Sequence, residues 1–306
     1  MFPRYFLINA RTNLHMCLSS EKNCPDTRGF GPVWRPVGPQ SVTWRIHREV
    51  VLLLGWGRAI LLQFAHPLVA QGVAEHSVFV SQPAARLQRL RSTIDSMLAL
   101  TFGDPAEAAE AAERINAIHD RVHGELRSGT KGPAAGSLYS AHDAALLKWV
   151  HATLLDSFML TYERCVGLLT PEEEDAYCFE SSSIEPLLGI PTGYLPRTVR
   201  ELQDYMEQMF RSKQVEVNET ARSLAKEVLY PKLAWPIRPL AWPLRLFTIG
   251  NLPPSIRTAY GFSWKSRQDR ALRIFTALIR RLLPLIPSIF KHWKAARAAE
   301  KRWWTN

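Results

Sequence analysis

The sequence predicts an all-α protein built as a single large helical domain. Apolar residues recur at helical spacing over most of the chain, and helix starts are marked by capping residues followed by proline at Asp104-Pro105 and Thr170-Pro171. We find no stretch of useful length in which apolar and polar residues alternate, as they do in a half-buried strand. The chain has 306 residues, 46% of them hydrophobic, which is enough to bury a sizeable core.

The expected elements follow one another along this domain. Residues 1–43 are rich in proline and glycine and predict an irregular N-terminal arm. A helical core should occupy residues 44–255, with basic C-terminal helices over residues 256–306 packed on it. Pro67 should start or kink a helix, and two stretches, 128–137 and 230–243, should be irregular. Helices are expected at residues 44–64, 68–77, 81–103, 104–124, 142–164, from Thr170 onward, and at 199–213, 217–230, 270–283 and 288–304.

The clearest of these helices is the one predicted from Asp104 to Gly124. Asp104 can cap it, Pro105 suits its first position, and Gly124 is a natural stop. One face is expected to carry mostly small side chains, with a histidine near the end, and such a face leaves room for a flat macrocycle. Taken alone, the histidine could equally be an ordinary core or surface residue. The face consists of Ala108, Ala111, Ala112, Ile115, His119 and Val122.

The net charge of +10 is concentrated at the C-terminal end. Residues 256–306 contain twelve Lys and Arg against two Asp and Glu, so the rest of the chain is balanced. Tryptophan, leucine and isoleucine lie between these basic residues, a pattern that suits peripheral contact with an anionic membrane surface. The alternative is an ordinary packed helix pair with snorkelling lysines. No nucleic-acid-binding motif accompanies the charge.

The N-terminus has no continuous apolar segment and no twin-arginine pair, so a cytoplasmic protein is expected. Residues 50–74 are long enough to span a bilayer. Arg58, Gln63 and His66 interrupt this stretch, which favours a pair of buried helices instead.

Several histidines lie in apolar runs and indicate a polar pocket inside the helical core. They are His66, His76 and His151, together with His119. His119 and His123 stand four residues apart, which is metal-ligand spacing on a helix. Zinc-protease and di-iron motifs are not supported, because position 120 is aspartate and no second carboxylate–histidine motif is present.

Arg89 and Thr93 also stand four residues apart within an expected helix. A guanidinium and a hydroxyl on one face can anchor a carboxylate such as a haem propionate, with the threonine near a bound ligand. The alternative is a surface arginine beside a threonine bonded to its own backbone.

Four segments together resemble the family of the latex-clearing rubber oxygenase and the fungal mycophenolic-acid-pathway oxygenase. They are GWGRAILLQFAHPLVAQGVAEHS, RLQRLRSTIDSMLALTFG, INAIHDRVHG and YSAHDAALLKWVHATL. The resemblance extends from about Arg48 to about Arg297 and includes IGNLPPSIRTAYGFSW and the PLIP turn. It implies a globin-like core that binds haem b.

The resemblance also implies roles for individual residues. The proximal iron ligand falls on His119, with His123 as the close alternative and His151 as the third. Arg89 and Thr93 match the family's Arg-x-x-x-Thr pair. His66 and His151 are further candidates for contact with the cofactor, and Glu75 and His76, together with Thr93, are candidate catalytic residues.

The function expected from this resemblance is a haem b-dependent oxygenase that uses O₂ on an apolar, isoprenoid-like substrate, by oxidative cleavage or by hydroxylation. Two alternatives remain at this point. One is a haem-binding sensor or carrier without turnover, and the other is a helical protein that works at membrane surfaces through its basic end.

Overall fold

The structure, a computed structural model, describes residues 36–76, 83–127, 132–230, 239 and 241–305, without the side chains of residues 83–87 and 89. The described residues belong to one compact unit. The predicted arm of residues 1–43 lies almost wholly outside the described part of the chain and stays a prediction.

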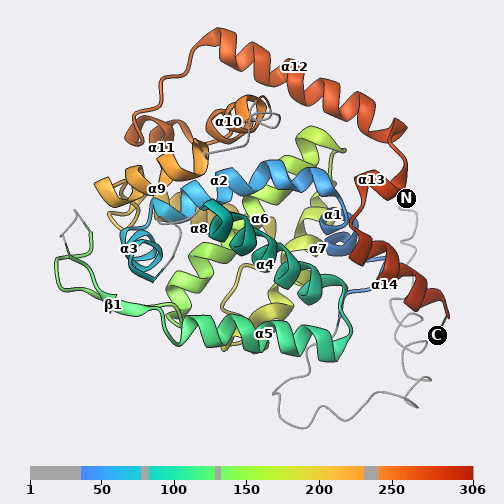
Figure 1. Cartoon of the computed structure of the whole chain (residues 1–306), viewed down its shortest axis with the longest axis horizontal. Helices are drawn as coiled ribbons and strands as arrows, with labels where there is room; N and C mark the ends of the chain where they lie inside the picture. Colours follow the sequence, from blue (N-terminus) through green and yellow to red (C-terminus); the bar gives the residue numbers. More distant parts are fainter. Residues whose placement is uncertain (1–35, 77–82, 128–131, 231–238, 240, 306) are drawn as a thin grey trace, which may run out of the picture. The chain divides into compact units, whose positions relative to one another are not determined.

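The predicted all-α class is confirmed (Figure 1). Helices make up nearly all of the regular structure described, beside one antiparallel pair of three-residue strands in which Gly124 lies opposite Tyr139. Strands this short show no alternation, so sequence reasoning missed them. The helices are α1 (Val42–His47), η1 (Val50–Leu52), α2 (Leu53–Phe64), α3 (Pro67–His76), α4 (Pro83–Phe102), α5 (Pro105–His119), α6 (Ala144–Cys165), α7 (Pro171–Ser181), η3 (Ser182–Leu188), α8 (Val199–Arg211), α9 (Glu219–Leu229), α10 (Ala241–Gly250), α11 (Pro254–Ala259), α12 (Ser266–Leu282), η5 (Leu283–Leu285), α13 (Ser288–Lys291) and α14 (Lys294–Thr305), and the strands are β1 (His123–Glu125) and β2 (Leu138–Ser140).

The core is centred on α2 and α6, which pack directly against each other. Their inward faces carry fully buried side chains, among them Leu61 and Leu62 of α2 and Trp149 and Phe158 of α6. Burying each such side chain is worth about 1.5–3 kcal/mol. These two helices are therefore the frame on which the other elements are placed.

A glycine lets α2 approach α6 this closely. A Cβ on Gly55 would stand 2.9 Å from the backbone oxygen of Ser157, and it would also meet the Thr161 hydroxyl, which donates to that same oxygen. We expect Gly55→Ala to lower the free energy of unfolding by about 1–3 kcal/mol, because backbone atoms cannot move aside as a flexible side chain can.

Chemical denaturation of purified protein would test this expectation. Gly167→Ala is the matched control, because nothing lies within 4 Å of the added carbon there. Its effect should stay within about 0.5 kcal/mol. Equal stability of the two variants would show that the α2–α6 contact tolerates a methyl group.

Helix α5 starts as predicted but ends earlier. Asp104 and Glu107 form a reciprocal capping box at its start, with Pro105 in the first turn. The helix ends at His119, not at Gly124 as the sequence predicted. The strand pairing explains this: the backbone from residue 123 onward bonds to β2, and the N–H of Ala141 donates to the oxygen of Val122 at 2.8 Å.

The prediction of one continuous C-terminal helix over residues 288–304 was wrong, because this stretch is divided into α13 and α14. At the break the chain bonds to the segment between α1 and η1: His292 forms a bridge with Glu49, and the N–H of Trp293 donates to the oxygen of Arg48 at 3.0 Å. The side chains of His292 and Glu49 also lie 3.0 Å apart. These tertiary hydrogen bonds replace the helical ones.

The stretch predicted as a helix over residues 44–64 is divided into α1, η1 and α2, and Pro67 opens α3 as expected. No single helix in the described residues has the length and apolar character to cross a membrane. The segments Val50–Phe64 and Pro67–His76 meet that test only as a pair, and they are bent by 105° relative to each other.

Candidate functional site

A small cavity of about 120 Å³ lies among α1, α4, α6, α7 and η3. Its walls are mostly apolar, with Met97 of α4, Leu154 and Phe158 of α6 and Ile184 of η3 among them. A few polar groups converge on it. An apolar cavity with a small number of convergent polar groups is the arrangement expected of a small-molecule site.

Three polar side chains of the cavity form one chain of hydrogen bonds. His47 Nδ1 lies 3.0 Å from the Thr101 hydroxyl, and His47 Nε2 lies 2.9 Å from the Tyr177 hydroxyl. Thr101 gives its only hydroxyl proton to the oxygen of Met97 at 3.0 Å. Nδ1 of His47 must therefore carry the proton, and Nε2 accepts from Tyr177. Burial, with a smaller contribution from His151, lowers the pKa of His47 to about 4, so the ring is neutral.

His151 faces the same cavity from α6. Its Nε2 is buried and has no hydrogen-bond partner in the described structure. Burial lowers the pKa of His151 to about 4, so this imidazole is neutral as well. A neutral imidazole with an unpartnered nitrogen is a potential metal ligand.

His119 lies in the last turn of α5 and is half-buried. Its Nδ1 is buried and has no hydrogen-bond partner in the described structure. Its ring meets His142 edge to face, with 5.6 Å between the ring centroids, and His142 Nε2 lies 2.8 Å from Asp120 Oδ1. Burial first, and then His142, lower the pKa of His119, while Asp120 opposes the shift.

His123 lies in β1 and is exposed. Because α5 ends at His119, the two histidines are not on successive turns of one helix, and the helical spacing predicted for them does not exist. His123 instead lies beside His76: their rings stack at 6.4 Å, and His76 Nε2 is 3.0 Å from the His123 oxygen. Within the described residues, no group of three or more His, Cys, Asp or Glu is arranged to hold a metal ion.

The candidate catalytic residues Glu75 and His76 lie in a different place from the cavity. The hydroxyl of Tyr139 donates to Glu75, and Arg127 Nε lies 2.6 Å from the same carboxylate. The hydrogen bond from Tyr139 is the largest cause that lowers the pKa of Glu75. Glu75 and Arg127 line a polar cleft of about 430 Å³ with Gln71, Ala74, Asn218 and Thr220.

The other predicted residues are spread around these two places. His66 is buried at the junction of α2 and α3, its Nδ1 has no partner in the described structure, and burial lowers its pKa to about 4. Thr93 is exposed on α4. Arg89 is on the same helix, but its side chain lies outside the described part of the structure. Thr93 lies near the middle of α4, whereas His119 lies at the end of α5 that is farther from the junction at Gly103 and Asp104.

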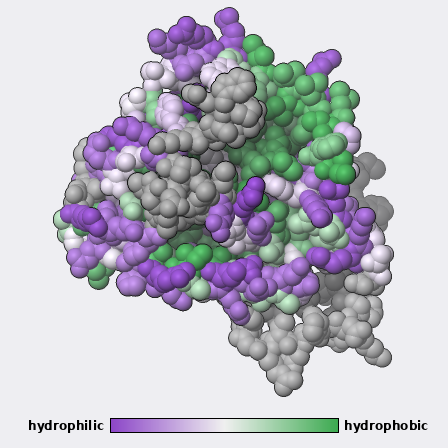
Figure 2. All heavy atoms as spheres, viewed as in Figure 1, coloured by the Kyte–Doolittle hydropathy of each residue, from purple (hydrophilic) through white to green (hydrophobic). Residues whose placement is uncertain are grey.

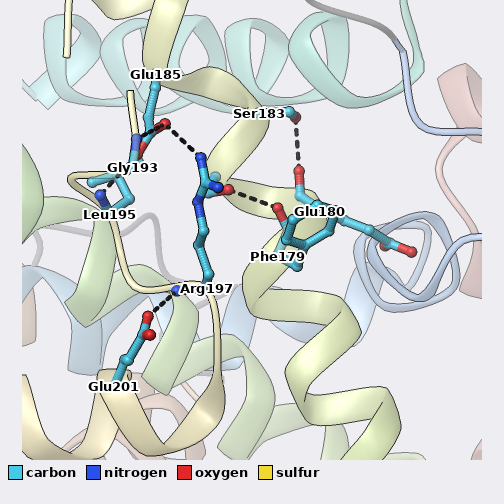
Figure 3. A network of polar contacts seen from close by, with 9 residues as sticks. Phe179, Glu180, Ser183, Glu185, Gly193, Leu195, Arg197 and Glu201 are labelled. Carbon is cyan, nitrogen blue, oxygen red and sulfur yellow. Dashed lines mark hydrogen bonds and ion pairs between the residues drawn. The ribbon is translucent and has the colours of Figure 1, made fainter. Parts of the chain in front are cut away.

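The η3 wall of the cavity is fixed by a buried carboxylate. Glu185 accepts hydrogen bonds from the N–H groups of Gly193 and Leu195, both at 2.8 Å, and Arg197 lies 3.5 Å from the same carboxylate (Figure 3). On the opposite side, the Glu180 carboxylate accepts from the first amides of α1, Thr43 N at 2.7 Å among them. These contacts hold η3 to the loop before α8 and hold α7 to the start of α1.

Sequence reasoning missed three of the polar residues in the cavity: His47, Thr101 and Tyr177. Each stands on a different helix, and no spacing rule connects them. The one usable signal was His47 in the segment WRIHREVVLLL, a histidine at the edge of an apolar run like the others singled out. The same signal singled out His151, and the structure brings His151 to the same cavity.

Comparison with known proteins identifies the family of this chain. The family model "ER-bound oxygenase mpaB/B'/Rubber oxygenase, catalytic domain" matches residues 44–281. No curated protein and no solved structure matches the chain. The matched stretch begins in α1, ends in α12, and includes the residues of the cleft and all of those that line the cavity except Val37 and Thr43. Since it covers well over half of the chain, the protein belongs to the mpaB and rubber oxygenase family, whose catalytic domain it carries.

Proposed function

We propose that this protein is a haem b-dependent oxygenase that uses O₂ to cleave or hydroxylate an apolar, isoprenoid-like substrate, with His119 as the iron ligand. Membership of an oxygenase family supports the reaction class. The observation that carries the cofactor assignment is the His119 imidazole, which is kept neutral and has a buried nitrogen without a partner in the described structure. Haem iron, when bound, would supply the activation of O₂.

The donor chemistry fits a b-type haem. An iron-ligating imidazole must be neutral, and burial lowers the pKa of both His119 and His151. His151 is the alternative ligand, because its unpartnered Nε2 belongs to a residue that lines the cavity. His123 is less well suited, since it is exposed and lies against His76.

The volume of the cavity sets a further condition. Sites for small molecules and cofactors measure roughly 300–1,000 Å³, and the cavity beside His151 measures about 120 Å³. With His151 as the ligand, a porphyrin therefore enters only if the walls of this cavity separate. Met97, Leu100 and Thr101 of α4 form one of these walls.

The protein's own residues have distinct parts in this proposal. The apolar walls formed by Leu154, Phe158 and Ile184 would bind an apolar substrate and exclude water. The hydroxyl of Tyr177 donates a hydrogen bond to His47 Nε2 and so fixes the orientation of that neutral ring. Arg89 would bind a propionate of the haem, and Thr93 would lie near the bound ligand. Glu75 and His76 remain candidate acid and base, although they line or adjoin the surface cleft.

Absorption spectra of the purified, haem-loaded protein test the ligand. The wild-type protein should show a Soret band and one haem per chain. We expect His119→Ala to lose most of the haem or to change the axial-ligand bands, while circular dichroism shows that the helices persist. His123→Ala is the matched control and should keep the wild-type spectrum.

Three results would contradict parts of this proposal. An unchanged spectrum in His119→Ala together with loss in His151→Ala would move the ligand to His151. Absence of any Soret band in the wild-type protein would exclude haem. A normal Soret band without O₂ uptake in the presence of polyunsaturated isoprenoids would favour a haem sensor or carrier.

A further inference from the structure

An apolar surface patch lies at the end of α12 and continues through η5 and α13. Figure 2 shows it as a green area at the upper right, where Figure 1 places these elements. Leu285 and Phe290 are 77% and 72% exposed, and the other members are between 39% and 61% exposed. The α12–α13 patch consists of Ile274, Leu278, Leu282, Leu285, Ile286, Ile289 and Phe290.

The side chains of the patch do not take part in packing α12 on the core. Helix α12 packs on the core through its other face, where Leu272 and Thr276 are buried, and Leu283 of η5 is buried after it. The exposed face of such a helix normally carries polar residues. Large contiguous apolar patches on soluble domains mark sites of interaction.

The charged side chains on the segments that form the patch are basic, and the nearest acidic residue before these segments, Asp269, lies 3.6 Å from Arg273. From Arg270 to Ala299 the chain has seven Lys and Arg and no Asp or Glu. Arg273, Arg280, Arg281 and Lys294 are exposed on the segments that form or adjoin the patch. Apolar side chains surrounded by cations match the interface of an anionic lipid bilayer, where the apolar groups enter the acyl region and the cations meet the headgroups.

We propose that the α12–α13 patch docks the protein on anionic lipid membranes, with Leu285, Ile289 and Phe290 inserted into the interface. This inference concerns a different surface from the cavity and holds whichever cofactor the protein binds. The sequence analysis expected membrane contact through the whole basic C-terminal region, and this proposal restricts that contact to the α12–α13 patch. Helix α14 turns Ala296 and Ala299 toward Leu98 and Phe102 of α4, so part of that end is occupied by packing within the chain.

A second copy of this chain is a less suitable partner for the patch. A two-fold symmetric contact would place the same cationic segments of both copies opposite each other, and no acidic residue lies between Arg270 and Ala299 to compensate them. Anionic headgroups provide the missing opposite charge. The charge of the patch therefore favours lipid over self-association.

Co-sedimentation with phosphatidylcholine vesicles, with and without phosphatidylserine, tests this proposal on the full chain. We expect the wild-type protein to bind the phosphatidylserine vesicles more tightly and to be released by salt. The double variant Leu285→Ser and Phe290→Ser should bind about tenfold or more weakly. The double variant Arg280→Glu and Arg281→Glu should lose the preference for phosphatidylserine, again by about tenfold or more.

The matched control is Leu138→Ser with Leu168→Ser. These leucines are 74% and 73% exposed but lie outside the patch. This variant should bind vesicles as the wild-type protein does. Unchanged vesicle binding in the Leu285/Phe290 variant would overturn the proposal. So would a wild-type dimer in sedimentation analysis that this variant dissociates, because a second copy would then cover the patch.

Discussion

Arg58→Met is expected to lower the free energy of unfolding by roughly 3 kcal/mol, because it removes a buried cation and leaves the hydrogen-bond acceptors around it unpaired, while the Asp156 side chain is 32% exposed and partly hydrated. Arg58 is 5% exposed and connects three elements. Its Nη1 lies 2.6 Å from Asp156 Oδ2 and donates to Ser157 Oγ at 2.8 Å on α6, and its Nε donates to the oxygen of Asn251 at 2.7 Å, just after α10. Methionine fills similar space but satisfies none of these groups.

Urea denaturation of the purified variant measures this loss. Arg200→Met is the control, because Arg200 is 90% exposed and lies 4.0 Å from Asp204 on one helix, so the change there should stay within about 0.5 kcal/mol. Arg58→Lys should recover only part of the stability, since an ammonium group does not have the fork of donors that reaches α6 and Asn251 together. If Arg58→Met were as stable as Arg200→Met, the contacts of Arg58 with α6 and with Asn251 would not contribute to stability.

The second large effect is expected for Glu185→Ala, which should lower the free energy of unfolding by about 3 kcal/mol. Glu185 is 2% exposed, and its carboxylate is the acceptor for the N–H groups of Gly193 and Leu195. Alanine leaves the buried N–H of Leu195 without its acceptor. The same change should loosen η3, which carries Ile184 and Leu187 into the cavity wall.

Two measurements follow this change. Denaturation gives the free energy, and hydrogen exchange should show faster exchange at the amides of Gly193 and Leu195. Glu207→Ala is the control: its side chain is 58% exposed and pairs only with Arg211 within α8, so about 0.5 kcal/mol is expected. Unchanged exchange at Leu195 would contradict the assigned role of the carboxylate.

The candidate site shows where sequence reasoning ends. His151 and His119 could be singled out because a histidine in an apolar or alanine-rich helix is unusual in itself. The hydrogen-bond chain from Thr101 through His47 to Tyr177 could not, because its members come from α4, α1 and α7, and only packing brings them within 3.0 Å. Glu75 and His76 were predicted from their place beside other motif residues, and their partner Tyr139 comes from β2, a strand too short to leave a pattern.

The sequence by itself determined the all-α class, the family, and the helix starts at Asp104 and Thr170, because periodicity and capping are local properties of the chain. Only the tertiary structure decided where α5 ends, why α13 and α14 are separate, and which apolar side chains stay exposed. Each of these outcomes depends on a hydrogen bond or contact with a distant segment: Val122 with Ala141, Trp293 with Arg48, and Ala296 with the helix α4. The intrinsic helix and strand propensities of these residues differ little between the alternative structures. The tertiary contact therefore decides which structure forms.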